Sequence, residues 1–140
     1  MKCLLVEDDL QFRHILKGML STSCECDIAV NGQEAIDSFR LAHEAKRPYN
    51  VIFMNVTMPV IDGLTALRAI RSLEKDMDIP PGLKIKVVMM TASGDPRAVI
   101  KAFKEGEANS FLVKPITRKI LDNEMATLML EEEPFVKTGT

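Results

Sequence analysis

Polar side chains of chemically useful types follow four hydrophobic runs of the chain. Acids occupy positions 7–9 after the first run, and Asn55, Thr91 and Lys114 each end another run. If these runs are parallel strands, their carboxyl ends meet at one edge of a sheet. Carboxylates bind Mg²⁺, and a hydroxyl and an ammonium can hold the oxygens of a phosphoryl group. The residue types predict a phosphate and cation site whose central position, Asn55, carries a neutral amide.

The elements that must position this site alternate between strand and helix. The predicted strands are Lys2–Val6, Glu25–Val30, Val51–Met54, Ile85–Met90 and Ser110–Val113. The predicted helices cover Leu10–Leu20, the segment after an Asn31-Gly32 turn, Gly63 to about Lys75, the segment from Asp95, and the segment through Leu128. This alternation predicts an α/β fold: a doubly wound five-stranded parallel sheet with five helices, flavodoxin-like, covered on both faces.

Local signals refine these elements. Asp9 and Asp62 precede helices and are expected to cap them. The first helix carries apolar residues at helical spacing, which predicts an inward face made of Phe12, Ile15, Leu16, Met19 and Leu20. The segment 76–82 contains two prolines and a glycine and is expected to be a loop. The domain is expected to cover 1–131, with a C-terminal tail at 132–140.

Composition excludes several classes of function. The chain has 140 residues, 46% hydrophobic and 27% charged, a balance typical of one globular domain. The net charge of -2, with scattered basic residues, predicts no nucleic acid binding. No apolar stretch reaches the length of a membrane span, and no signal peptide is recognisable, so we expect a cytoplasmic protein without a membrane partner. The three cysteines are expected to be reduced.

Four motifs, taken in order, resemble the receiver domain of two-component response regulators, of the single-domain chemotaxis type. They are residues 4–9 (LLVEDD), 51–63 (VIFMNVTMPVIDG), 90–92 (MTA) and 111–115 (FLVKP). The resemblance covers about residues 1–131. It implies a phosphorelay signal-transduction protein that is not an enzyme and that takes Mg²⁺ as cofactor.

The resemblance also assigns roles to the predicted site. Glu7 and Asp8 match the acidic pair that holds Mg²⁺, and Thr57 matches the residue whose backbone carbonyl joins them. Asn55 occupies the place of the phosphoacceptor aspartate, which would also be a metal ligand.

The phosphate-binding and switch positions complete this assignment. Thr91 matches the switch hydroxyl and is followed by Ala92. Phe111 matches the aromatic that follows the switch inward. Lys114 matches the lysine that pairs with phosphate. Pro115 directly after it is a candidate for a cis peptide bond.

The amide at Asn55 departs from the family pattern. A carboxylate oxygen can attack phosphorus, whereas an amide oxygen is neutral and its lone pair is delocalised. We therefore expect no phosphorylation at Asn55 and weaker Mg²⁺ binding. Because Glu7, Asp8, Thr91 and Lys114 remain, an engineered Asp-to-Asn change is favoured over a naturally phosphorylation-independent receiver that acts as an interaction module.

The expected partners are a histidine kinase or phosphotransfer protein and a downstream protein bound through the 95–131 face. A haloacid-dehalogenase-like phosphatase is the alternative from the enzyme class. That family needs a second carboxylate two residues after the nucleophile, where this chain has Thr57. A nucleotide-binding module is less favoured, since no Gly-rich phosphate loop follows the first strand.

Overall fold

The structure, a computed structural model, describes residues 1–92, 97, 100, 101, 104 and 107–132, with side chains described up to residue 128. The elements are β1 (Lys2–Val6), α1 (Leu10–Leu20), β2 (Glu25–Ala29), α2 (Gly32–Glu44), β3 (Val51–Asn55), α3 (Gly63–Asp76), a 3₁₀ turn (Pro81–Leu83), β4 (Lys86–Thr91), β5 (Ser110–Val113) and α5 (Arg118–Glu132).

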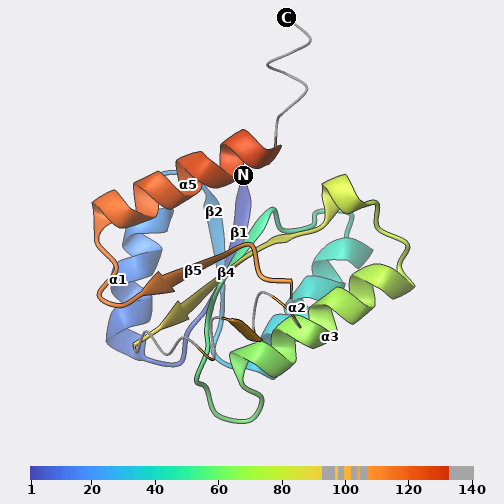
Figure 1. The fold of residues 1–140 in the computed structure, drawn as a ribbon, viewed down its shortest axis with the longest axis horizontal. Coiled ribbons are helices and arrows are strands. Elements are labelled where there is room, and N and C mark those ends of the chain that lie inside the picture. The colour runs from blue at the N-terminus through green and yellow to red at the C-terminus, as the bar shows by residue number, and fades with distance from the viewer. Residues whose placement is uncertain (93–96, 98–99, 102–103, 105–106, 133–140) are drawn as a thin grey trace, which may run out of the picture.

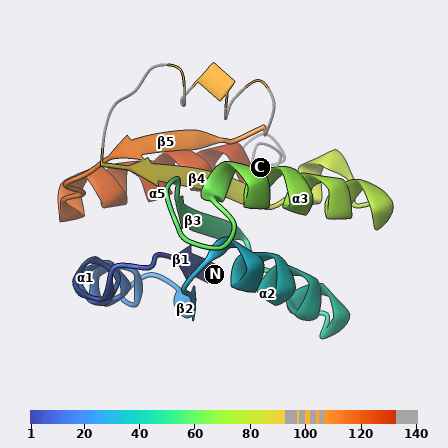
Figure 2. The same ribbon diagram turned by 90° about the horizontal axis from the view of Figure 1, so that it is seen from below.

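The strands form one sheet in the order β2-β1-β3-β4-β5, and every neighbouring pair is parallel. Helices α1 and α5 cover one face, while α2 and α3 cover the other (Figures 1 and 2). The chain leaves β1 toward β2 on one side and returns to β3 on the other, so the strand order reverses between β1 and β3. In open parallel sheets, ligands bind at such a reversal point. The predicted α/β flavodoxin-like fold is confirmed.

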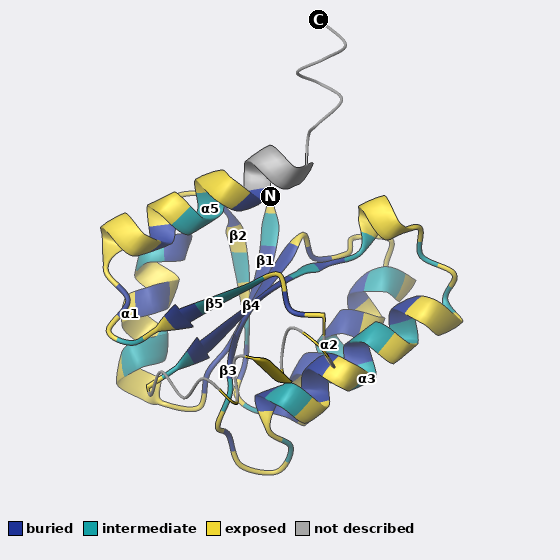
Figure 3. Ribbon diagram, in the orientation of Figure 1, coloured by how far each residue is buried: buried dark blue, intermediate teal, exposed yellow. Residues whose placement is uncertain are grey.

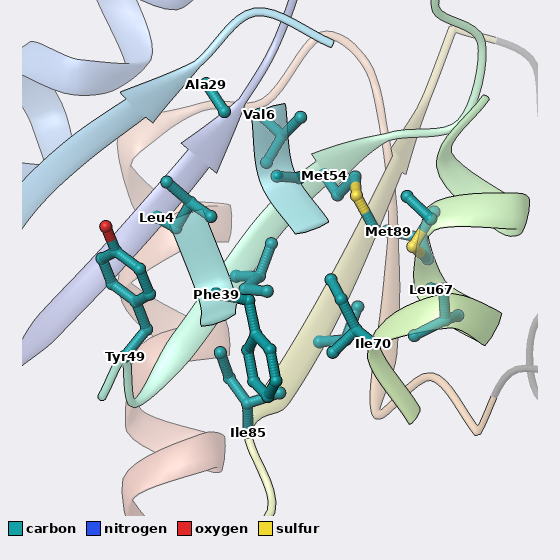
Figure 4. Close-up of a cluster of buried hydrophobic side chains, with 14 of the residues drawn as sticks. Leu4, Val6, Ala29, Phe39, Tyr49, Met54, Leu67, Ile70, Ile85 and Met89 are labelled. Atoms are coloured by element: carbon teal, nitrogen blue, oxygen red, sulfur yellow. The ribbon is translucent and has the colours of Figure 1, made fainter. Parts of the chain in front are cut away.

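The core consists of two apolar layers, one on each face of the sheet. In β1, Leu4 and Val6 belong to the layer under α2 and α3, whereas Cys3 and Leu5 belong to the layer under α1 and α5. Figure 4 shows the first layer, with Phe39 of α2 among the strand side chains. Because both faces of the central strands are buried (Figure 3), these strands read as continuous apolar runs instead of alternating patterns.

Side-chain caps fix where the first three helices begin. Asp9 and Asp62 accept hydrogen bonds from Phe12 N at 3.0 Å and Thr65 N at 2.8 Å, as expected for N-caps. The prediction of a separate turn at Asn31-Gly32 is wrong, because α2 already begins at Gly32. Asn31 instead caps α2 directly by accepting from Glu34 N at 2.9 Å, since asparagine suits both turns and N-caps.

The boundaries of three strands differ from the prediction by one residue. Asn55 and Thr91 lie inside β3 and β4 as their last residues, while Val30 falls outside β2. β4 begins at Lys86, because the N–H of Ile85 donates to the carboxylate of Glu74 at 2.7 Å instead of joining the sheet. The loop expected over 76–82 is shorter in the structure, because α3 continues to Asp76 and a 3₁₀ turn covers Pro81–Leu83.

The predicted inward face of α1 is partly wrong. Leu16 and Leu20 are buried and Phe12 and Met19 pack beside them, but Ile15 is 62% exposed. The helix covers an edge of the sheet, so its buried stripe is narrower than its apolar stripe. Most of the fourth predicted helix, from Asp95, lies outside the described residues. Among the described residues, no helix is long and apolar enough to cross a membrane.

A buried ion pair ties α3 to the amino ends of β4 and β5. Arg71 Nη1 lies 2.7 Å from Glu74 Oε1 and also donates to the carbonyl of Ile85 at 2.9 Å. Arg71 Nη2 donates to the carbonyl of Glu107 at 2.7 Å and to Asn109 Oδ1 at 3.1 Å. The Arg71 and Glu74 side chains are 9% and 1% exposed. The pair therefore joins three elements at the end of the sheet opposite to the predicted site.

The three cysteines are free, as expected. Cys3 of β1 pairs in register with Cys26 of β2, and the thiol of Cys24 donates to the carbonyl of Leu20 at 3.3 Å. Hydrogen bonds with the thiols of Cys24 and Cys26, together with burial, raise the pKa of Cys3. A protonated, buried thiol is a weak nucleophile, so Cys3 acts as an apolar core residue.

Candidate functional site

The register of the sheet brings the predicted site residues to one edge. Val6 pairs with Met54, Asn55 pairs with Met90, and Thr91 pairs with Val113. The residues that end β1, β3, β4 and β5 are therefore level with one another. The site lies at the carboxyl ends of the strands, where the strand order reverses.

Glu7 is the fully buried carboxylate of this site. Its Oε1 accepts from the Lys114 ammonium at 2.7 Å. Its Oε2 accepts from Asn55 Nδ2 and from the backbone N–H of Asp9, both at 3.1 Å. A buried carboxylate is stable only when it is paired and hydrogen-bonded. Glu7 meets that requirement with groups from three different segments.

The amide of Asn55, which is 8% exposed, points at the acids. Its Nδ2 donates to Glu7 Oε2 at 3.1 Å, to Asp8 Oδ1 at 3.3 Å and to the carbonyl of Thr57 at 2.9 Å. The structure thus brings together all four residues that were predicted from the sequence to form the metal site. Three oxygens converge on one nitrogen.

These oxygens are of the type that suits Mg²⁺, which takes carboxylate and carbonyl ligands at about 2.0–2.1 Å. They surround a hydrogen-bond donor, however, and their distances from Asn55 Nδ2 are those of hydrogen bonds. Within the part of the chain that the structure describes, no group of three or more His, Cys, Asp or Glu side chains is arranged to hold a metal ion. Glu7, Asp8 and Thr57 could accept Mg²⁺ only after the amide moved aside.

Lys114 reaches the site from the end of β5. Its ammonium lies 4.2 Å from the centre of the Phe12 ring as well as against Glu7, and its backbone N–H donates to the carbonyl of Thr91 at 2.7 Å. The peptide bond to Pro115 is cis. Sequence analysis assigned Phe12 only to the core. Its place three residues after the cap Asp9, in the first turn of α1, was the signal that it lies beside the site.

The remaining predicted residues line the β4–β5 side of the site. Thr91 is partly exposed and the following Ala92 is exposed. Phe111 is partly buried and packs against the core layer under α2 and α3. Phe111 pairs in register with Met89, and Thr91 is two residues after Met89 on the same strand. Because side chains alternate along a strand, Thr91 and Phe111 share one face of the sheet.

Two residues that support the site, Gly63 and Arg13, were not identified as such from the sequence. A Cβ at Gly63 would overlap the carbonyl oxygen of Asn55, so α3 can begin against β3 only with glycine there. Arg13 Nη1 donates to the carbonyl of Glu7 at 3.0 Å. The position of Gly63 directly after the cap Asp62 could have indicated its role, whereas nothing in the sequence indicated the role of Arg13.

In EDTA, the Asn55→Asp variant is expected to unfold with a free energy about 1–2 kcal/mol lower than this chain. The substitution replaces a hydrogen-bond donor by a third carboxylate beside Glu7 and Asp8. Two unit charges about 4 Å apart repel by about 4 kcal/mol at an effective dielectric constant near 20, and Lys114 offsets part of this. Urea denaturation of both proteins measures the difference, and millimolar Mg²⁺ should reduce it. Equal stability in EDTA would show that the three side chains do not share a pocket.

Comparison with known proteins agrees with this geometry. The model of the response regulator receiver domain matches residues 3–126. The chain is 30% identical to a chemotaxis protein CheY homolog of Campylobacter jejuni, with 92% of each protein covered. It is 32% identical to a probable transcriptional regulator of Cyanophora paradoxa, covering 98% of this chain and about half (52%) of that protein.

Solved structures agree as well. The receiver domain of Ssk1 of Saccharomyces cerevisiae, crystallised with the histidine phosphotransfer protein Ypd1, superimposes with a TM-score of 0.80 at 26% identity, covering 94% of this chain and 91% of that one. The response regulator TrrA of Thermotoga maritima, in complex with Mg²⁺ and beryllium fluoride, gives 0.71 at 28% identity, covering 91% and 99%. This chain belongs to the family of response regulator receiver domains, the signalling modules of two-component systems.

Proposed function

We propose that this chain is a receiver that cannot be phosphorylated at its acceptor position and that presents the unphosphorylated conformation to its partners. The observation that carries this proposal is the position of Asn55. Its side chain stands at the end of β3 among Glu7, Asp8 and Lys114, where a phosphoacceptor carboxylate would stand. An amide there cannot form an acyl phosphate.

The other residues of the site are those of a working receiver. Lys114 would hold a phosphoryl oxygen in the variant that carries a carboxylate at position 55. Thr91 would donate its hydroxyl to another oxygen, while Ala92 directly after it would leave room for the group. Phe111, on the same face of the sheet as Thr91, would follow the hydroxyl inward and change the outer surface.

Because this set is complete, we propose that Asn55 replaces an aspartate, by engineering in preference to natural drift. The codon for position 55 in the source genome decides between the two. A naturally phosphorylation-independent receiver is the second reading. A dehalogenase-like phosphatase is not favoured, because Thr57 contributes its backbone carbonyl to the site and has no carboxylate.

The proposal includes Mg²⁺ as a cofactor that this chain binds more weakly than a receiver with an aspartate at position 55 would. The ion would be held by the carboxylates of Glu7 and Asp8 and by the carbonyl of Thr57, and it would neutralise phosphoryl charge when bound. With the neutral amide of Asn55 in place of an anion, the site carries one negative charge fewer for the ion.

The proposed downstream partner binds the face over 95–131. Of the described residues there, Ile100, Val113 and Ile120 are large hydrophobic residues exposed to solvent. Exposed apolar side chains of this size are typical of partner surfaces when they lie together. Phe111 in β5 connects this face to the site. The proposal also includes a histidine kinase or phosphotransfer protein as phosphodonor. It further includes a receiver domain over 1–131 and a cytoplasmic location.

The function is tested by partner binding in the presence of acetyl phosphate and Mg²⁺. We expect the affinity of this chain for its downstream partner to stay constant when acetyl phosphate is added, whereas that of Asn55→Asp changes about tenfold, equal to 1.4 kcal/mol. Val113→Ser and Ile120→Ser should weaken binding in both backgrounds. Ile15→Ser, which also changes an exposed apolar residue but on α1, is the matched control. Chemical-shift mapping that placed the partner on α1 would contradict the proposed face.

A further inference from the structure

In the interior of the site, hydrogen-bond acceptors surround the side-chain nitrogen of Asn55. Three acceptor oxygens from Glu7, Asp8 and Thr57 lie 2.9–3.3 Å from Asn55 Nδ2. Two of them belong to carboxylates, which attract a donor more strongly than neutral oxygens do. A primary amide has only two N–H groups, so the three acceptors share them.

We propose that the side-chain amide of Asn55 acts as a built-in substitute for the divalent cation, holding together the oxygens that would otherwise bind Mg²⁺. The inference rests on the proposed function, since it concerns the same site. It goes further in stating that the amide competes with the ion for the same oxygens instead of merely being a poor ligand for it.

The geometry favours competition over simple loss of a ligand. An asparagine that ligated the ion weakly would direct its carbonyl oxygen toward the metal position. Here the nitrogen faces the acids, and the reverse orientation would place the amide oxygen against Glu7 and Asp8. Mg²⁺ binding therefore requires the Asn55 amide to break its hydrogen bonds and rotate or withdraw. Two of these three hydrogen bonds have a carboxylate as acceptor, and hydrogen bonds to charged acceptors are stronger than those to neutral ones.

Charge pairing explains why the site is stable around an amide. The Lys114 ammonium compensates the buried Glu7 at 2.7 Å, and Asp8 is exposed to water. The Asn55 amide then satisfies the acceptors that remain. The site thus needs no ion to keep its acids together.

The proposal predicts an unusual order of Mg²⁺ affinities. Asn55→Ala removes the amide without adding any ligand, yet it should bind Mg²⁺ about tenfold more tightly than this chain, a difference of 1.4 kcal/mol. Asn55→Asp should bind most tightly of the three, because it adds an anion. If Asn55 were merely a poor ligand, this chain would bind at least as tightly as the alanine variant.

Calorimetric titration of metal-free protein with MgCl₂ alone measures this order. An affinity of Asn55→Ala that exceeds that of the chain supports the proposal, and an equal or lower affinity overturns it. Asn55→Val, whose side chain likewise offers no ligand, replaces the alanine variant if that variant does not fold.

Nuclear magnetic resonance of the unmodified chain gives a second reading. The Asn55 side-chain amide protons should exchange with water more slowly than those of Asn123, an exposed amide on α5, and should keep their chemical shifts in millimolar Mg²⁺. Exchange as fast as that of Asn123 would overturn the proposal. Neither measurement involves phosphate, so a failure of Asn55→Asp to accept a phosphoryl group would count against the proposed function alone.

Discussion

Incubated with acetyl phosphate and Mg²⁺, this chain is expected to gain no phosphoryl mass, whereas the Asn55→Asp variant gains one phosphoryl group. In the variant, a carboxylate oxygen attacks phosphorus, the bond between phosphorus and the acetate oxygen breaks, and acetate leaves with its electron pair. The product is an acyl phosphate on residue 55. In this chain the nitrogen of Asn55 is bound by three acceptors and the amide oxygen is a weak nucleophile.

Intact mass spectrometry measures the phosphorylation directly. The complete absence of labelling in this chain is the largest effect expected at the site. Asn50→Asp is the matched control, because it adds a carboxylate beside β3 at the opposite, amino end of the strand. That control should remain unlabelled, and hydroxylamine should remove the label from Asn55→Asp, as it does from acyl phosphates. Equal labelling of the chain and of Asn55→Asp would mean that another residue is the acceptor, contrary to the proposed function.

The second large effect is expected far from the site, at the buried ion pair of α3. Glu74→Ala should lower the free energy of unfolding by about 3–5 kcal/mol, the range for breaking a buried pair. The substitution leaves the Arg71 guanidinium buried without its counter-charge and the N–H of Ile85 without its acceptor. That loss is a large share of the roughly 5–15 kcal/mol of a typical domain.

The chain provides a control of the same spacing. Arg40 and Asp37 form an ion pair of 2.8 Å three residues apart on α2, as Arg71 and Glu74 do on α3, but its side chains are 44% and 46% exposed. Asp37→Ala should therefore lower the stability by less than about 1 kcal/mol. Urea denaturation of the two alanine variants compares a buried and an exposed ion pair of the same spacing along a helix. Similar losses in both would contradict the assignment of the Arg71 pair as a stabilising link.

Replacing both partners by apolar residues separates the ion pair from its surroundings. A variant with Arg71→Met and Glu74→Leu removes both charges together, so no buried charge is left alone. It should recover part of the stability lost in Glu74→Ala. The recovery should be incomplete, because Arg71 also donates to the carbonyls of Ile85 and Glu107.

The site could be located from the sequence because parallel strands share one edge. Once the apolar runs are strands separated by helices, the residues that end them must meet, and Glu7, Asn55, Thr91 and Lys114 were named on that ground. The caps Asp9 and Asp62 were equally predictable, since an N-cap bonds to a backbone only three residues away. These are local rules that a sequence expresses directly.

Tertiary structure alone decided how these groups pair. Glu7 and Lys114 are 107 positions apart, and only the closed sheet shows that their side chains bond to each other. The same holds for the three oxygens that surround the Asn55 amide, whose orientation no spacing rule predicts. Ile15 is exposed because α1 lies at an edge of the sheet, and Arg71 reaches Glu107 because α3 passes the amino end of β5. Periodicity indicates which residues share a face of a helix, but the position of that helix on the sheet determines whether the face is buried.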